Sequence, residues 1–348
     1  MIVYKIVKKI CVIILVFISF SSCEISNEDK GKYVDGYFGR VKSITQFEYN
    51  AIEDNGKIIK GSIFKDPFGF SHGSEEKYDN IGNRIERINY NGFYKIDEKY
   101  ISIFDTKKNE IEYSKYDANG QLETKIKKRY NNNNLIVEEI ELDNNGNLNN
   151  KIIIDYDEKQ NIVREMTYDK VGEIEREIYY KYDEKGNNIE VKSDAKDAFF
   201  GNLGYLIIKK YDSQNRIIQS LRYERYDLKD YVFLNNVKYV YNDTVNSKET
   251  IRFNTDGTQE FSVIRKYDEN GNVVEQSQQS KNENLKFTYK FDENNNEIEM
   301  LRYNSRGKIT FKQKYELIYD KKGNIVKEIH FYNDKAEKIV ERDIQYFE

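Results

Sequence analysis

A short motif repeats along most of the chain and restricts what the chain can fold into. It consists of an aromatic residue, then Asp or Asn, two polar residues, and Gly or Asn. Clear copies begin at Tyr78, Tyr116, Tyr168, Tyr182, Tyr267 and Tyr319. From position 78 to 182 the anchors, degenerate copies included, are alternately 12 and 14 residues apart, and this spacing returns at 241, 253 and 267. A fixed short period indicates a repeat architecture.

Each copy has the chemistry of a tight hairpin turn. The Asp or Asn side chain accepts a hydrogen bond from the backbone two residues further on. The last turn residue needs positive φ, which glycine adopts without steric penalty and asparagine tolerates well. Where glycine is missing, we expect Asn109, Asn134, Asn215 and Asn295 in its place, while Gln160 and Ala336 fit less well. The motif therefore predicts a type I turn with a G1 bulge.

The segments between turns predict strands. Ile174–Tyr180 and Ile325–Phe331 are rich in β-branched and aromatic residues and are too short for helices. One strand per repeat predicts an all-β fold, a long antiparallel β-meander of roughly 18 to 20 strands. We expect this sheet to be twisted or curled, because long flat sheets are rare. Apolar residues alternate with charged ones, which predicts a thin, one-sided core.

The amino terminus has the features of an export signal. Three lysines precede an apolar stretch, Ile10–Phe20, that is too short to span a bilayer as a stable helix. The stretch ends in Phe20-Ser21-Ser22-Cys23, which resembles the lipobox of bacterial lipoproteins. The resemblance implies a signal peptide at 1–22, a lipidated Cys23 and a polar tether at 23–32. An ordinary cleaved signal, or an uncleaved anchor with Cys23 incidental, remains the alternative.

The repeat resembles the YD repeat of the Rhs and teneurin families. The similarity is carried by Tyr182–Ile189 and Tyr267–Val273 and covers most of Tyr78–Glu348. This chain has shorter units, no tryptophan, and neither a toxin nor a plug domain, so it is more similar to small lipoproteins with such repeats. The chain is short for a shell that encloses a cargo, and we do not expect one.

Interruptions in the repeat spacing divide the chain into segments. Residues 33–77 contain two expected strands around Asn55-Gly56 and are expected to cap the first sheet edge. Regular repeats occupy 78–192, irregular ones 193–240, and regular ones again 241–348. Ser193–Gly204 is expected to be an insertion carrying Phe199 and Phe200, either a binding tip or a loop folded over the sheet.

One segment matches a catalytic pattern. Gly69–Gly73 has the G-x-S-x-G spacing of a serine hydrolase around Ser71, but a hairpin repeat follows where a helix is required. The two histidines, His72 and His330, are expected to be ordinary residues. Asp268–Asn272 and Asp292–Asn296 place oxygens as a calcium loop does, yet lack the glycine and glutamate of an EF-hand. We therefore expect no enzyme, no cofactor and no metal.

The distribution of charge argues against one class of partner. Lysine, arginine and acidic residues alternate, and no long basic block would remain after signal cleavage, so nucleic acid is not an expected partner. The sequence predicts a non-catalytic, lipid-anchored cell-envelope protein of the outer membrane or cell surface, with a protein or polysaccharide partner. The alternatives are an envelope hydrolase using Ser71 and a shell-like fragment of a toxin system.

Overall fold

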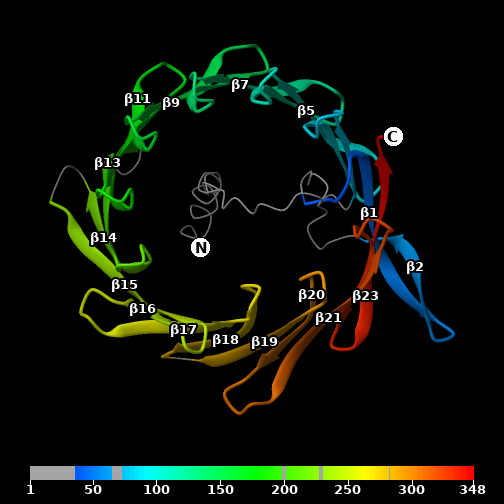
Figure 1. Cartoon of the computed structure of the whole chain (residues 1–348). Coiled ribbons are helices and arrows are strands. Elements are labelled where there is room, and N and C mark those ends of the chain that lie inside the picture. The colour runs from blue at the N-terminus through cyan, green and yellow to red at the C-terminus, as the bar shows by residue number, and fades with distance from the viewer. Residues whose placement is uncertain (1–35, 65–72, 198–200, 227–229, 282) are drawn as a thin grey trace.

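The computed structural model describes residues 36–64, 73–197, 201–226, 230–281 and 283–348. Within these residues the regular structure is β-strand throughout, joined by short turns. Figure 1 shows that the strands stand side by side in a ring around a central space. Over the same residues, no helix is long and apolar enough to cross a bilayer.

Twenty-three strands follow one another in the described part of the chain. They are β1 (Val41–Asp54), β2 (Lys57–Ile63), β3 (Gly73–Tyr78), β4 (Arg84–Tyr90), β5 (Ile96–Phe104), β6 (Glu110–Tyr116), β7 (Leu122–Tyr130), β8 (Ile136–Asp143), β9 (Leu148–Tyr156), β10 (Ile162–Tyr168), β11 (Ile174–Tyr182), β12 (Asn188–Asp197), β13 (Gly201–Tyr211), β14 (Ile217–Tyr226), β15 (Val232–Asn242), β16 (Ser247–Phe253), β17 (Gln259–Tyr267), β18 (Val273–Ser280), β19 (Asn284–Phe291), β20 (Glu297–Tyr303), β21 (Ile309–Tyr319), β22 (Ile325–Tyr332) and β23 (Lys335–Tyr346). From β3 to β23 each strand pairs antiparallel with the next.

Strand β1 closes this sheet into a barrel. It pairs antiparallel with β23 along Val41–Asn50 and with β3 along Ser43–Phe47, on its two opposite edges. The all-β, antiparallel expectation is confirmed, but the expected twisted or curled meander is closed into a barrel. Strand β1, from the expected capping segment 33–77, does cover the first edge, that of β3, and it also covers the last edge, that of β23. In the described chain, β2 pairs with β1 and extends this hairpin outside the ring (Figure 1). The other 22 strands form the wall.

The alternation of 12 and 14 residues produces the stagger that a barrel needs. A row of directly paired residues runs from Glu112, near the start of β6, through β7, β8 and β9 to Tyr168 at the end of β10. The row crosses the wall from one rim to the other, so the strands are tilted. A stagger of about one residue per strand gives a tilt of about 35° and, for 22 strands about 4.8 Å apart, a backbone diameter of roughly 40 Å.

The turns have the expected backbone. At a typical copy, Gly271 has φ of 86° and donates to the Asp268 carbonyl, while the Asp268 side chain accepts from the amide of Asn270. Positive φ also occurs at Asn134, Gln160, Asn215 and Asn295, as predicted. Two positions were predicted wrongly. Lys108 rather than Asn109 has positive φ, and the last turn is a two-residue turn at Asn333 and Asp334 rather than one that places Ala336 in that conformation.

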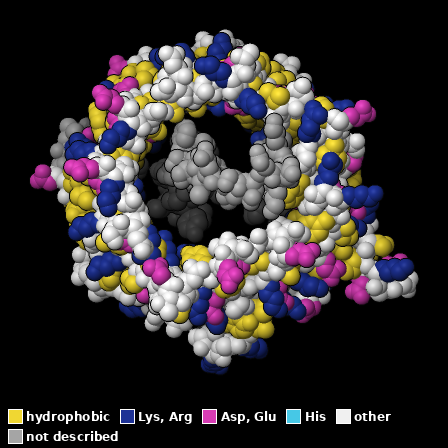
Figure 2. Space-filling model, viewed as in Figure 1, with side chains coloured by type: hydrophobic (Ala, Val, Ile, Leu, Met, Phe, Trp, Pro, Cys, Tyr) yellow, Lys and Arg dark blue, Asp and Glu magenta, His cyan; other side chains and the backbone are white. Residues whose placement is uncertain are grey.

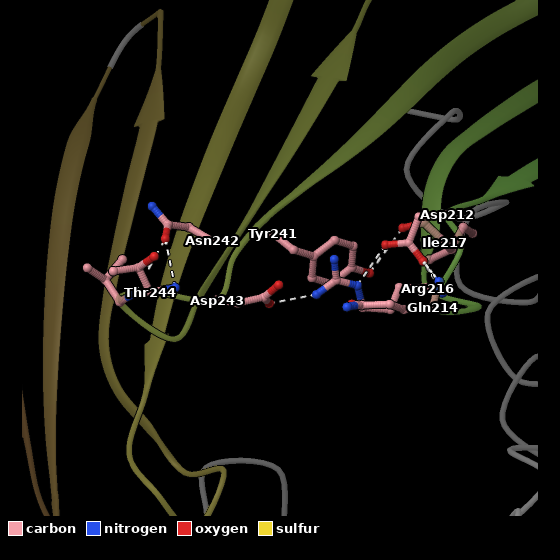
Figure 3. A network of polar contacts seen from close by, with 9 residues as sticks. Asp212, Gln214, Arg216, Ile217, Tyr241, Asn242, Asp243 and Thr244 are labelled. Atoms are coloured by element: carbon pink, nitrogen blue, oxygen red, sulfur yellow. Dashed lines mark hydrogen bonds and ion pairs between the residues drawn. The ribbon is translucent and has the colours of Figure 1, made fainter.

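The two rims of the barrel differ. At one rim, which we call the tyrosine rim, a tyrosine at the end of a strand, or one residue before it, donates its hydroxyl to the first carbonyl of the preceding strand, at 2.8–3.0 Å. These tyrosines are Tyr130, Tyr156, Tyr182, Tyr211 and Tyr241. Figure 3 shows this rim at Tyr241, where Arg216 pairs with Asp212 of its own turn and with Asp243 of the next turn, at 2.7 and 2.6 Å. Adjacent turns are therefore tied together.

The expected insertion at Ser193–Gly204 is mostly strand. Strands β12 and β13 pair without interruption from Glu190 and Ile208 to Asp197 and Gly201. The irregular spacing here reflects longer strands, because two extended partners satisfy more backbone groups than a loop would. Phe199 and Phe200 lie outside the described residues.

Buried apolar side chains gather at the closing seam, which we define as β22, β23, β1 and β3. Val41, Ile44 and Tyr78 form a cluster there, against which Tyr37, Ile344 and Tyr346 pack. Ile339 in β23 is completely buried. The seam thus concentrates the hydrophobic stabilisation where no covalent turn joins neighbouring strands.

Candidate functional site

Alternate side chains of every strand lie on two faces of the wall. In β11, Ile178 and Tyr180 are on one face, whereas Tyr179 and Lys181 are on the other and are more exposed. Less exposed side chains of neighbouring strands are paired in register, so they form one continuous face. The same alternation occurs in β7, β15 and β19. A concave wall crowds its side chains together and a convex wall spreads them apart. The less exposed face is therefore the inner face of the barrel.

The outer face carries an ionic ladder. Glu138 lies between Arg129 and Lys151, at 3.1 and 2.9 Å, and Glu275 lies between Lys266 and Lys286, at 2.9 and 2.7 Å. Hydrogen bonds from these cations hold the pKa of Glu138 and Glu275 below the usual range. Figure 2 shows charged side chains around the outer perimeter of the ring. A lysine or arginine facing lipid at mid-bilayer costs about 2–4 kcal/mol, so this face suits water.

The inner face is lined with tyrosine. These inner-face residues are Tyr100, Tyr113, Tyr180, Tyr205, Tyr239, Tyr289 and Tyr315. Burial raises the pKa of Tyr113 and Tyr239, which keeps both hydroxyls neutral at ordinary pH. A neutral tyrosine offers an apolar ring face and a hydroxyl that both donates and accepts. The inner wall can therefore contact a polar ligand by stacking and by hydrogen bonding.

A cavity of about 610 Å³ lies against β4, β5 and β6. The rings of Tyr100 and Tyr113 stack there, with centroids 5.7 Å apart and planes at 25°. Arg87 donates its Nε to Asn89 Oδ1 at 3.0 Å, and Ser102 donates to Glu110 Oε1 at 2.6 Å. Stacked aromatic faces bordered by hydrogen-bonding groups suit sugar rings or peptide amides. The lining is Gly82, Asn83, Arg84, Glu86, Arg87, Asn89, Tyr100, Ser102, Phe104, Glu110 and Tyr113.

A second polar cluster ties the closing seam together. Glu328 in β22 contacts Arg342 Nη2 at 2.6 Å and His330 Nε2 at 2.8 Å, and Arg342 donates its Nε to Gln46 Oε1 in β1 at 2.6 Å. The Tyr315 ring meets the His330 ring edge-on at 4.8 Å. Burial pushes the pKa of Glu328 upward, but the His330 hydrogen bond and the Arg342 charge outweigh it and lower this pKa to about 2. The polar groups of this cluster are hydrogen-bonded or ion-paired to one another, so we infer that the cluster stabilises the fold.

The residues singled out from the sequence lie in different places. Cys23, Ser71 and His72 are outside the described residues, as are Phe199 and Phe200. His330 lies in the seam cluster. Asp268, from the first calcium-like loop, uses its carboxylate to accept from Asn270 and from the backbone and side-chain amides of Asn272. No three His, Cys, Asp or Glu side chains in the described chain converge as a metal site requires.

Sequence reasoning did not locate the cavity, and it left two roles open for the tyrosine-rich strands: to stack sugar rings or dock an extended peptide, or only to fill a shallow core. The alternation within each strand was visible. What could not be found was which face is concave, because isoleucine occurs on both faces, as Ile101 and Ile126 do. The register around the closed ring decides this.

The fold and its two faces define a closed antiparallel β-barrel with a charged outer face and a tyrosine-lined inner face. No family model matches the chain, and no curated protein matches it. Among solved structures, a porin-like protein from Bacteroides uniformis is similar at 10% identity, covering 88% of this chain and 98% of that one, with a TM-score of 0.29. A porin-like protein from Bacteroides vulgatus is similar at 13% identity, covering 64% and 92%, with a TM-score of 0.27.

Proposed function

We propose that the chain is a non-catalytic, lipid-anchored cell-envelope protein whose barrel binds an extended polar polymer on its inner wall. The observation that carries this proposal is the contrast between the faces. Tyrosines and the cavity beside Tyr100 and Tyr113 are on the inner face, whereas the outer face carries ion pairs beside exposed apolar residues such as Ile264. A lumen roughly 40 Å across between backbone walls has room for a hydrated polymer.

The envelope location in this proposal comes from the amino terminus. The apolar stretch before Cys23 supports export, and the lipobox-like residues support a diacylglycerol on the thiol. The described chain begins beside the tyrosine rim, where Phe38 exchanges hydrogen bonds with the side chain of Asn324. The anchor would then hold this rim towards the membrane, with the barrel beside the bilayer rather than within it.

The wall is proposed to bind and not to catalyse. The inner-face side chains at the cavity are already engaged with one another, as in the pairs Arg87–Asn89 and Ser102–Glu110. Ser102 and Glu110 are held to each other, and Lys128 Nζ contacts the other carboxylate oxygen of Glu110 at 2.5 Å, so we assign this group to binding. Positioned donors, acceptors and ring faces are the properties of a recognition surface.

Replacing the stacked pair tests the proposal. The double substitution Tyr100→Leu with Tyr113→Leu is expected to weaken binding of the host's envelope polysaccharide at least tenfold, because each ring contributes about 0.5–1.5 kcal/mol beyond its buried area. Isothermal titration calorimetry measures the affinity. The matched control is Tyr179→Leu on the outer face, which is expected to change nothing. An equal loss in both variants, or no binding by the wild type, would contradict the proposal.

Closure of the wall favours one further candidate, a shell that encloses a polypeptide, as a toxin-associated YD-repeat protein would. The β1 pairing that joins both sheet edges is the observation in its favour. This candidate requires a polypeptide that co-purifies inside the barrel and is protected from protease. An empty, freely accessible lumen would exclude it.

A further inference from the structure

Two cations of like charge face each other directly across strands on the inner wall. Lys248 in β16 is paired in register with Arg265 in β17. Many directly opposed charges in this sheet are opposite in sign, as Lys181 with Glu190 and Lys266 with Glu275 are. Like charges directly opposite each other across strands destabilise a sheet. The pair therefore has a cost that the fold does not require.

On the outer face, two acidic residues are also directly opposed across strands, but each has a basic partner. Glu177 and Asp194 are also directly opposed, but Arg164 contacts Glu177 and Arg225 contacts Asp194, so both charges are neutralised. Among the described residues, neither Lys248 nor Arg265 forms an ion pair with a carboxylate. The inner pair keeps its two positive charges available.

The groups that Lys248 and Arg265 contact are neutral and suited to a ligand. Lys248 Nζ lies 4.7 Å from the centre of the Tyr239 ring and 5.5 Å from that of Tyr241, and Arg265 donates its Nε to Gln276 Oε1 at 2.8 Å. Burial, followed by the charge of Arg265, lowers the pKa of Lys248. An anion placed between the two cations would relieve this repulsion, because it would supply the missing counter-charge.

We infer that Lys248 and Arg265, with Tyr239 and Gln276 beside them, form an anion subsite that binds a carboxylate-bearing polysaccharide such as a uronic acid polymer. The carboxylate sits between the ammonium and the guanidinium. The tyrosine ring stacks on a sugar face, and the amide of Gln276 bonds a hydroxyl. This inference rests on the proposed function, since it names the ligand class of the same inner wall.

The test measures binding of polygalacturonate to the full mature protein. The double substitution Lys248→Gln with Arg265→Gln is expected to reduce affinity at least tenfold, and wild-type binding is expected to weaken as salt rises. The matched control, Lys266→Gln with Lys286→Gln, removes the same charge from the outer face and is expected to change affinity less than twofold. The inner double variant is also expected to melt no lower than the wild type, since a repulsion is removed; a clear loss of thermal stability would indicate a structural role and overturn the inference.

The remaining outcomes separate this inference from the proposed function. If the inner variant binds polygalacturonate as well as the wild type does, while the Tyr100 and Tyr113 variant loses polysaccharide binding, the anion subsite is wrong and the binding wall stands. If both inner variants bind like the wild type, both proposals fail. Binding of polyglutamate but not polygalacturonate would show that Lys248 and Arg265 bind an acidic peptide. It would contradict the inference that their ligand is a polysaccharide.

Discussion

A version of the protein that starts at Glu24, behind an ordinary cleavable secretion signal, is expected to be soluble, whereas the full chain is expected in the membrane fraction. The truncated version lacks both the Cys23 thiol and the apolar stretch before it. A diacylglycerol contributes about 0.8 kcal/mol of membrane affinity per buried CH₂, which is enough to hold an exported protein on a bilayer. Fractionation with an alkaline carbonate wash, together with intact mass, measures both states.

The result of this fractionation depends on the outer face of the barrel. Its outer face presents ion pairs such as Lys151–Glu138 and Lys286–Glu275, and lipid contact would desolvate these charges. Removing the anchor should therefore release the whole protein. If the truncated version stays in the membrane after the wash, the wall is embedded in lipid and the assignment of the outer face is wrong. If the full chain is soluble with an unmodified Cys23, the anchor is wrong and the barrel stands alone.

Glu328→Gln is expected to destabilise the barrel by about 3 kcal/mol at pH 7. The pKa of Glu328 falls from 4.5 to about 2 on folding, and each pKa unit corresponds to about 1.4 kcal/mol. The substitution also leaves Arg342 without its carboxylate partner in the seam. Denaturant unfolding of both proteins measures the difference.

The pH dependence has a defined sign. Because folding depresses the pKa of Glu328, its stabilisation is fully present above the unfolded value of 4.5 and is lost as pH falls towards 2. The gap between wild type and Glu328→Gln should therefore narrow between about pH 5 and pH 2. Glu316→Gln on the outer face, half exposed and paired with Lys314 at 3.0 Å, is the control and should cost less than about 0.5 kcal/mol. A gap that does not change with pH would contradict the role given to Glu328.

Local structure could be predicted from the sequence because local chemistry decides it. The carboxylate of Asp268 and the positive φ of Gly271 are properties of five consecutive residues, and the turn follows from them. Strand positions then follow from the turns. The errors are also local: Lys108 has positive φ because it is the third residue after Asp105, as Gly271 is after Asp268, and Asn109 instead donates its side chain back to Asp105.

Closure could not be predicted in the same way. It depends on Thr45 facing Asp343 and Glu75, and nothing in the repeat marks residues 41–54 as the partner of residues 335–346. The alternation of 12 and 14 residues did carry information about closure. Neighbouring strands of unequal length stagger a sheet, and a staggered sheet can close into a barrel. Charge patterning was visible as well, but Lys248 becomes unusual only when the register places Arg265 opposite it.

Disulfide formation across the seam tests the closed barrel most directly. Thr45 and Asp343 are directly opposed in β1 and β23, and such residues have Cα atoms about 4.5–5.5 Å apart, within the range of a disulfide. In the version starting at Glu24, which has no other cysteine, Thr45→Cys with Asp343→Cys is expected to form an intramolecular disulfide under mild oxidation, seen by intact mass and by non-reducing electrophoresis. Thr45→Cys with Lys192→Cys, separated by many strands, should not. Failure of the first pair to cross-link in folded protein would mean that the wall is open.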